Sequence, residues 1–95
     1  MAVVLQMDFV VPSAEISAAL SKNAPERAES ITREPGFISK IWTFNADTHE
    51  AGGIYIFTDH HSAQKYLEMH KARLALFGIH QMNCKIFDIN VPLTR

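Results

Sequence analysis

Four runs rich in β-branched and aromatic residues alternate with two stretches of helical periodicity, and their order restricts the folds open to this chain. The sequence predicts strands over residues 2–11, 37–44, 52–58 and 83–91, with a helix after the first and after the third. This order predicts an α+β fold, the ferredoxin-like βαββαβ sandwich with a four-stranded antiparallel sheet and both helices on one face. At 95 residues, the chain is predicted to form a single domain over residues 1–95.

Capping and breaking residues delimit the first predicted helix. Ser13 follows the first strand and is a predicted N-cap, because its hydroxyl can accept a hydrogen bond from a free amide of the first turn. Pro25 interrupts the apolar stripe of this helix, and a proline inside a helix costs about 3 kcal/mol. We expect a kinked helix, or one restarted with Asn23 as a new N-cap, that ends before Pro35. The stripe consists of Ile16, Leu20, Ala24, Ala28 and Ile31.

The second predicted helix spans residues 62–77. Asp59 is its predicted cap, and Gly78 is expected to end it. The polar stretch 45–50 is predicted to be the hairpin loop that joins the second and third strands.

The predicted strands carry apolar residues on both of their faces. Two helices can cover only one face of a sheet, so the other face needs a different cover. A second copy of the same sheet is the simplest one, and we therefore predict a homodimer through the open face of the sheet. The opposed sets are Leu5 and Met7 against Val4 and Val10, Phe37 and Ile41 against Ile38 and Trp42, and Ile54 and Ile56 against Tyr55 and Phe57.

Composition excludes several classes of partner. The net charge of −1 leaves no basic excess to neutralise a phosphate backbone, so nucleic acid is not expected as a partner. The longest apolar run, residues 1–5, is far shorter than the roughly 20 residues of a membrane span, and no membrane association is expected. The single cysteine, Cys84, fits a reducing compartment. These features predict a small cytoplasmic protein.

His70 occupies the most informative position of the second helix. At about 100° per residue it points into the middle of an apolar arc, with Arg73 at the edge of that arc beside Tyr66. One interpretation is a core histidine bonded to a carbonyl or a carboxylate. The other is a base or hydrogen-bond donor that lines a pocket between helix and sheet. The arc consists of Ala63, Tyr66, Leu67, Leu74 and Phe77.

Trp42 and Tyr55 lie on neighbouring predicted strands. They are either core residues or the aromatic walls of a pocket, and the choice depends on a register that the sequence leaves open. Gly52 and Gly53 open the third strand, which indicates a bulge, a turn requirement or a close approach to the backbone.

The remaining motifs give little support for metal or nucleotide chemistry. His49 and Glu50 do not form an HExxH zinc motif, because the required second histidine is absent. His60 and His61 diverge in direction from His70, so no metal site and no cofactor are expected. Neither a dinucleotide fingerprint, nor a P-loop, nor the aromatic motif of RNA-binding relatives of this fold is present.

Several segments taken together resemble one known family. They are LQMDF, ERAESITREPGFISKIWTF, HEAGGIYIFTD, SAQKYLEMHKARL and KIFDINVPL, and they extend over residues 5–93. EPGF is common among related proteins, whereas HEAGGIYIFTD followed by YLEMHKARL is much more specific. The chain resembles the YdhR-type monooxygenases of the dimeric α+β barrel superfamily.

The resemblance implies a protomer whose sheet packs on that of its partner. It also implies kinship with cofactor-independent oxygenases that convert anthrones or hydroquinones to quinones. In such a reaction a hydroxyaromatic loses a proton in a dry pocket, and its anion passes an electron to O2. Recombination then gives a peroxide that loses water. The ligand would be a small aromatic molecule.

The resemblance also suggests roles for individual residues. His70 would be the base or hydrogen-bond donor, and Arg73 would stabilise the anion. The substrate-binding candidates are Trp42, Tyr55, Phe57 and Tyr66 as aromatic walls, with His49 and Glu50 at the rim and Asp8 and Gln6 as weaker candidates.

Two other functions fit the same residues. A non-catalytic dimer that binds or senses a small molecule would be stabilised by its ligand without turnover. A haem-binding relative would use His70 as its ligand and would show a shift of the Soret band on titration with haem.

Overall fold

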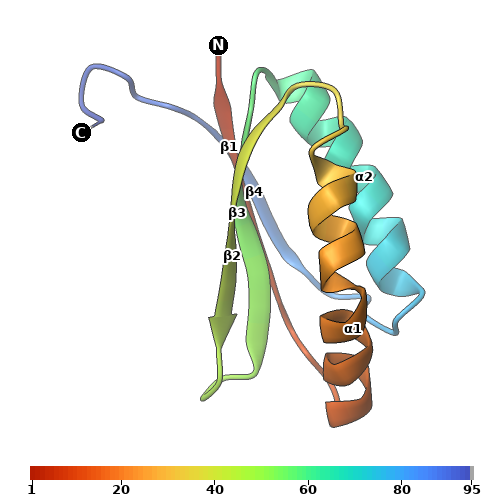
Figure 1. Cartoon of the computed structure of the whole chain (residues 1–95). Helices are drawn as coiled ribbons and strands as arrows, with labels where there is room; N and C mark the ends of the chain where they lie inside the picture. Colours follow the sequence, from red (N-terminus) through yellow and green to blue (C-terminus); the bar gives the residue numbers. More distant parts are fainter. Residues whose placement is uncertain (95) are drawn as a thin grey trace.

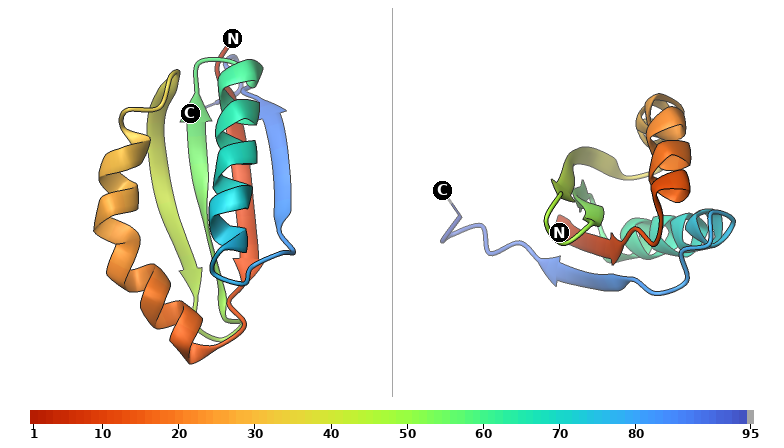
Figure 2. Two further views of the ribbon diagram at one scale, coloured as in Figure 1. Left: turned by 90° about the vertical axis from the view of Figure 1, so that its right-hand side faces the viewer. Right: turned by 90° about the horizontal axis from the view of Figure 1, so that it is seen from below.

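Four strands form one antiparallel sheet, and two helices pack on one of its faces (Figures 1 and 2). The computed structural model describes residues 1–94, so Arg95 of the predicted domain lies outside the described residues. The sheet order is β2-β3-β1-β4, which confirms the predicted ferredoxin-like fold. The elements are β1 (Val3–Val10), α1 (Ala14–Ile31), β2 (Phe37–Asn45), β3 (Glu50–Phe57), α2 (His60–Ala75) and β4 (Asn83–Asp88).

Helix α1 begins as predicted and continues through its proline. The Ser13 hydroxyl accepts a hydrogen bond from the Ile16 amide at 3.1 Å, which confirms the predicted N-cap. The helix is uninterrupted through Pro25, so the predicted restart at Asn23 is wrong, and its axis bends along its length (Figure 2). Pro25 removes the amide that would bond to the Ser21 carbonyl. Both residues are exposed, so water can satisfy that carbonyl at little cost.

Helix α2 and strand β4 differ slightly from their predicted bounds. Asp59 accepts a hydrogen bond from the Ser62 amide at 2.8 Å and is the N-cap, as predicted. The helix starts and ends two residues earlier than expected, and Gly78 follows it with a left-handed φ of 86°. Strand β4 ends three residues before the predicted position 91, because its pairing with β1 stops at Val3.

The core lies between the helices and the inner face of the sheet. Alternation along β1 buries every second residue, as the sequence indicates for Leu5 and Met7. On β3 the inner residues are Tyr55 and Phe57, at the predicted alternation. The helices contribute the remaining buried side chains, namely Leu20, Ile31, Ala63, Tyr66, Leu67, His70 and Leu74.

A β-bulge in β2 changes which of its residues face the helices. Phe37 pairs with Phe57, but the next pair is Ser39 with Ile56, so one residue is inserted between them. As a result Phe37 and Trp42 share the inner face, and Ile41 lies on the outer face. The predicted grouping of Phe37 with Ile41 is therefore wrong, because simple alternation does not hold across the extra residue.

The outer face of the sheet has no helix over it (Figure 1). Ile41 is 65% exposed and Phe87 is 49% exposed on this face. The segment after β4 extends away from the sheet on the same side, with Val91 and Leu93 exposed (Figure 1). Within residues 1–94, neither helix has the combination of length and apolar character that a membrane crossing requires.

Candidate functional site

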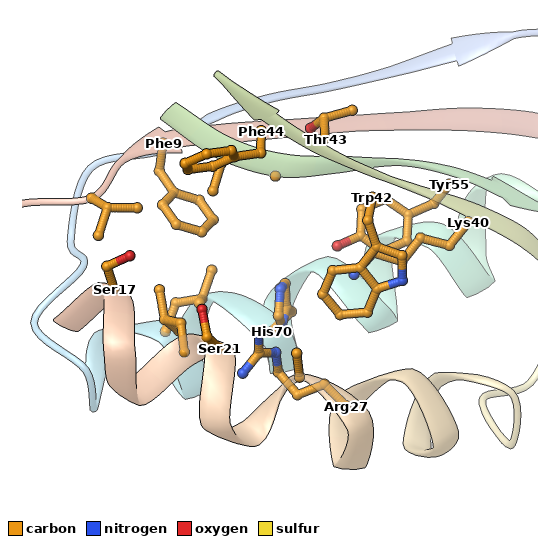
Figure 3. A pocket seen from close by; sticks show the side chains of 16 residues that line it. Phe9, Ser17, Ser21, Arg27, Lys40, Trp42, Thr43, Phe44, Tyr55 and His70 are labelled. Carbon is orange, nitrogen blue, oxygen red and sulfur yellow. The ribbon is translucent and has the colours of Figure 1, made fainter. Parts of the chain in front are cut away.

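A cavity of about 260 Å³ lies between α1 and the inner face of β2 and β3, with His70 of α2 on its wall (Figure 3). For comparison, an apolar cavity of about 150 Å³ in another protein binds benzene. Phe9 and Phe44 lie at one end, whereas Lys40, Trp42 and Tyr55 are grouped at the other (Figure 3). The polar residues whose side chains face it are Ser17, Ser21, Arg27, Lys40, Tyr55 and His70.

The strand register brings Trp42 and Tyr55 to the same face. Trp42 pairs with Gly53 and Lys40 pairs with Tyr55, so all of these residues face the helices. The Lys40 ammonium nitrogen lies 3.3 Å from the centroid of the Trp42 ring and 4.7 Å from that of Tyr55. A Cβ atom on Gly53 would lie 2.8 Å from Lys40 Cε and 2.9 Å from the Tyr55 ring. Because Gly53 has no side chain, Lys40 and Tyr55 can occupy the space beside it.

His70 is buried, and its polar partner is a cation. Its side chain is only 4% exposed and stacks on Tyr66 with ring centroids 5.3 Å apart. Nη2 of Arg73 lies 2.9 Å from Nδ1 of His70, and the same guanidinium donates to the Tyr66 hydroxyl at 3.4 Å. The interpretation of His70 as a core histidine bonded to a carbonyl or a carboxylate is therefore wrong about the partner, which is the Arg73 guanidinium.

This contact fixes the form of the imidazole. Arginine only donates, so Nδ1 of His70 must be the acceptor and the proton resides on Nε2. Burial, followed by the positive charges of Arg73, Lys40 and Arg27, lowers the pKa of His70 to about 3. At neutral pH His70 is therefore a neutral hydrogen-bond donor and a weak base.

Two cations on the cavity wall, Arg27 and Lys40, were not among the predicted site residues. Burial and the neighbouring charges of Arg27 and Arg73 lower the pKa of Lys40 to about 7. Burial, followed by Arg73, also lowers the pKa of Arg27. Signals for both were present in the sequence. Arg27 lies within the apolar stripe of α1 between Ala24 and Ile31, and Lys40 precedes Trp42 by two residues.

The family described as "Putative mono-oxygenase ydhR" matches residues 4–95. The chain belongs to this family. No curated protein sequence gives a significant match to this chain. Membership is consistent with the resemblance of the HEAGGIYIFTD and YLEMHKARL segments.

Solved structures similar to this ydhR-family chain share its fold at low sequence identity. SnoaB, a cofactor-independent oxygenase from Streptomyces nogalater, has a TM-score of 0.71 at 20% identity, with 94% of this chain and 93% of that chain covered. The "Putative antibiotic biosynthesis monooxygenase from Nitrosomonas europaea" has a TM-score of 0.73 at 15% identity, with coverages of 96% and 92%. Rv0793 from Mycobacterium tuberculosis has a TM-score of 0.69 at 14% identity, with coverages of 94% and 95%.

Three of the predicted site residues of this ydhR-family chain line the cavity, namely His70, Trp42 and Tyr55. Arg73 does not. It lines a separate hollow with Arg27 and Phe77, and its guanidinium contacts Nδ1 of His70.

The other predicted residues lie further from the cavity wall. Phe57 and Tyr66 are buried in the core, where Phe57 contacts Phe37 and both rings contact Tyr55. His49, in the hairpin loop with φ 58°, lines an adjoining hollow that shares Phe44 with the cavity.

The outer face of the two central strands carries Glu50, Gln6 and Asp8. Glu50 pairs with the exposed Val10. Gln6 and Asp8 alternate with the buried residues of β1 and therefore face away from the helices.

The remaining histidines and the cysteine do not converge on a site. His60 pairs with Asp88 at 2.8 Å on the surface, and His61 is exposed. Burial raises the pKa of the Cys84 thiol, which disfavours the nucleophilic thiolate. In the described part of the chain, no group of three or more histidine, cysteine, aspartate or glutamate side chains is arranged to hold a metal ion.

Proposed function

We propose that this protein is a cofactor-independent monooxygenase that oxidises a small hydroxyaromatic of the anthrone or hydroquinone type with O2 towards a quinone. The observation that carries the proposal is the cavity in which the Trp42 and Tyr55 rings lie across from the neutral His70. Membership of a family described as mono-oxygenases supports the reaction class. The fold shared with a cofactor-independent oxygenase is consistent with it, although a fold alone does not fix a function.

This reaction requires the protein to bind the substrate, to transfer a proton and to stabilise the negative charge that develops. For an anthrone, loss of a proton gives an electron-rich anion that passes one electron to O2. The two radicals recombine to a peroxide, which loses water and leaves one oxygen atom in the quinone. Within the cavity the attraction between the anion and a nearby cation is stronger than in bulk water, because the surrounding side chains lower the local dielectric.

His70 and Arg73 have distinct roles in this reaction. His70 donates a hydrogen bond from Nε2 to an oxygen of the substrate and stabilises the negative charge that develops there. Its low pKa makes it a poor proton acceptor, so the base role considered from the sequence is not assigned to it. Arg73 is a positioning residue, because it holds Nδ1 of His70 and so fixes the donor on the other nitrogen.

The active form that we propose is a homodimer in which the outer faces of two sheets pack together. On that face Ile41 of β2 pairs with Ile54 of β3, and Val4 of β1 pairs with Ile56 of β3 on one side and Phe87 of β4 on the other. The chain after Asp88 extends on the same side and carries exposed apolar residues that a second protomer would cover (Figure 1).

Oxygen uptake by metal-free and flavin-free protein tests the reaction. The substrates are a panel of anthrones and hydroquinones, and the references are heat-denatured protein and buffer, because these compounds autoxidise. We expect a rate well above both references, a loss of at least tenfold in His70→Ala, and an unchanged rate in the exposed-histidine control His80→Ala. Circular dichroism verifies that each variant is folded.

A rate equal to that of denatured protein across the panel contradicts the proposed reaction. Calorimetry on the same compounds then identifies the alternative. Binding without turnover would indicate a module that binds or senses a small aromatic molecule. Absence of a Soret shift on titration with haem would exclude the haem-binding alternative.

A further inference from the structure

The cavity is lined by cations without a compensating acid. Arg27 and Lys40 lie on its wall, and no aspartate or glutamate is among the residues that line it within positions 1–94. Neither cation forms an ion pair in this part of the chain, and Nη1 of Arg27 is buried without a hydrogen-bond partner. Burying like charges together costs free energy unless an anion joins them. The arrangement is therefore complementary to a negatively charged ligand.

Lys40 is held where it can exchange a proton with that ligand. Its ammonium nitrogen lies over the Trp42 ring at 3.3 Å from the centroid, at the end of the cavity that Trp42 and Tyr55 form. Burial and the two guanidinium groups favour the neutral amine, whereas the face of the indole favours the ammonium. Because these effects oppose each other, both forms of Lys40 are accessible near neutral pH, as a proton acceptor requires.

We propose that Lys40 is a catalytic residue that accepts the hydroxyl proton of a bound hydroxyaromatic and then pairs with the resulting aromatic oxyanion. This inference rests on the proposed function only in taking a hydroxyaromatic as the ligand. The O–H bond of the ligand breaks and an N–H bond forms on Lys40, so the neutral pair becomes an ion pair with no net change in protons. Arg27 supplies a second positive charge, 5.7 Å from the centroid of the Trp42 ring.

The charged and titratable groups around Lys40 come from every element that packs against it. Arg27 of α1 and Arg73 of α2 oppose its protonation when the cavity is empty. Tyr55 of β3 keeps its proton, because burial raises its pKa well above the ordinary value. His70 remains neutral and donates. Lys40 is thus the one side chain on this wall that changes charge near neutral pH.

The test uses 2-naphthol as the probe, since its anion absorbs at longer wavelength than the neutral form. Its methyl ether, 2-methoxynaphthalene, has no proton to give and measures binding to the aromatic cavity alone. The measurements are made at pH 8, where Lys40 in the empty cavity is mostly neutral. Absorption reports the form of the bound ligand, and calorimetry in two buffers of different ionisation enthalpy reports the net protons released.

For the wild-type protein we expect bound naphtholate with close to zero protons released. In Lys40→Met the bound ligand remains neutral naphthol and binds at least tenfold more weakly, while the methyl ether binds as before. Lys40→Arg restores the positive charge but cannot accept a proton. It is therefore expected to bind naphtholate and to release about one proton to the buffer.

Three results overturn the proposal. The first is neutral naphthol bound to the wild-type protein, and the second is naphtholate bound with release of a proton to the buffer. Either result excludes Lys40 as the proton acceptor. If the methyl ether still binds, the proposed function is unaffected. Failure of both naphthol and the ether to bind removes the aromatic cavity as a ligand site, and with it the basis of the proposed function as well.

Discussion

Nη2 of Arg73 lies 2.9 Å from Nδ1 of His70, three residues earlier on α2. A buried imidazole usually donates this nitrogen to a carbonyl or a carboxylate, and that contact would favour the charged ring. Here a permanent cation occupies the position, so the neutral ring is favoured and its single proton resides on Nε2. The pair thus converts a residue known for proton exchange into a fixed hydrogen-bond donor.

Arg73→Leu tests this relationship directly. Removal of the guanidinium takes away both a positive charge and the donor to Nδ1, so we expect the pKa of His70 to rise from about 3. Burial persists in the variant and should keep the pKa below the ordinary 6.5. An NMR titration of the ring carbon between the two nitrogens measures it. Arg33→Leu removes an exposed arginine and is the control. An unchanged pKa of His70 in Arg73→Leu would contradict the role assigned to Arg73.

His70 should also make stability depend on pH. Its pKa is about 3 in the folded protein and about 6.5 when unfolded, so the unfolded chain binds a proton more readily as the pH falls. The contribution of neutral His70 to the free energy of unfolding is therefore fully present above pH 6.5. It decreases towards pH 3, with a slope of up to about 1.4 kcal/mol per pH unit. Denaturant unfolding of the wild type and of His70→Gln isolates the contribution.

The difference in free energy of unfolding between these two proteins should shrink as the pH falls from 6.5 to 4. His80→Gln, at an exposed position, should leave the slope of the wild-type curve unchanged. Parallel curves for wild type and His70→Gln would mean that His70 is not held neutral.

Local signals in the sequence were sufficient for most of the fold. Ser13 and Asp59 cap the two helices because each has a side-chain oxygen and precedes a periodic apolar stretch. Alternation along β1 and β3 grouped correctly the residues that share a face, since these central strands pair regularly with each other, but it did not tell which face the helices cover. Placement of His70 in the arc of α2 followed from helical spacing alone, and the structure buries it there.

Long-range geometry accounts for what the sequence did not predict. The bulge after Phe37 depends on how β2 pairs with β3, and it determines that Lys40 and Trp42 face the cavity together. The spacing of three residues puts Arg73 beside His70 on α2, but the ring nitrogen that Arg73 contacts depends on side-chain conformations. Arg27 shares a cavity with Lys40 only because α1 lies across β2. Patterns of polarity along the chain contain none of these relationships.

The two glycines of β3 should respond very differently to alanine. A Cβ atom on Gly52 would lie 2.0 Å from the Met7 carbonyl oxygen, which is backbone and cannot yield without opening the pairing of β1 with β3. We expect Gly52→Ala to destabilise the protein by at least the roughly 1–3 kcal/mol typical of overpacking. Thermal unfolding measures this, and a stability equal to that of the wild type would show that the strands pair differently.

In Gly53→Ala the new atom meets the flexible end of Lys40 and the ring of Tyr55 instead. A smaller loss of about 1 kcal/mol is expected, because Lys40 can move. Its displacement from the indole should change the emission of Trp42, the single tryptophan of the chain. Unchanged emission would indicate that Lys40 keeps its position over the ring.

The outer face of the sheet gives the remaining prediction. Ile41 is 65% exposed at the centre of β2, and in a dimer of facing sheets the same residue is presented by both protomers. Ile41→Glu would bury two like charges in the interface, so we expect a dimer at micromolar concentration for the wild type and a monomer for this variant. Leu76→Glu is the matched control, since Leu76 is 87% exposed at the end of α2 on the opposite side of the sheet. Sedimentation equilibrium distinguishes the species. A monomeric wild type, or an Ile41→Glu variant that remains as dimeric as Leu76→Glu, would show that the sheet face is covered in some other way.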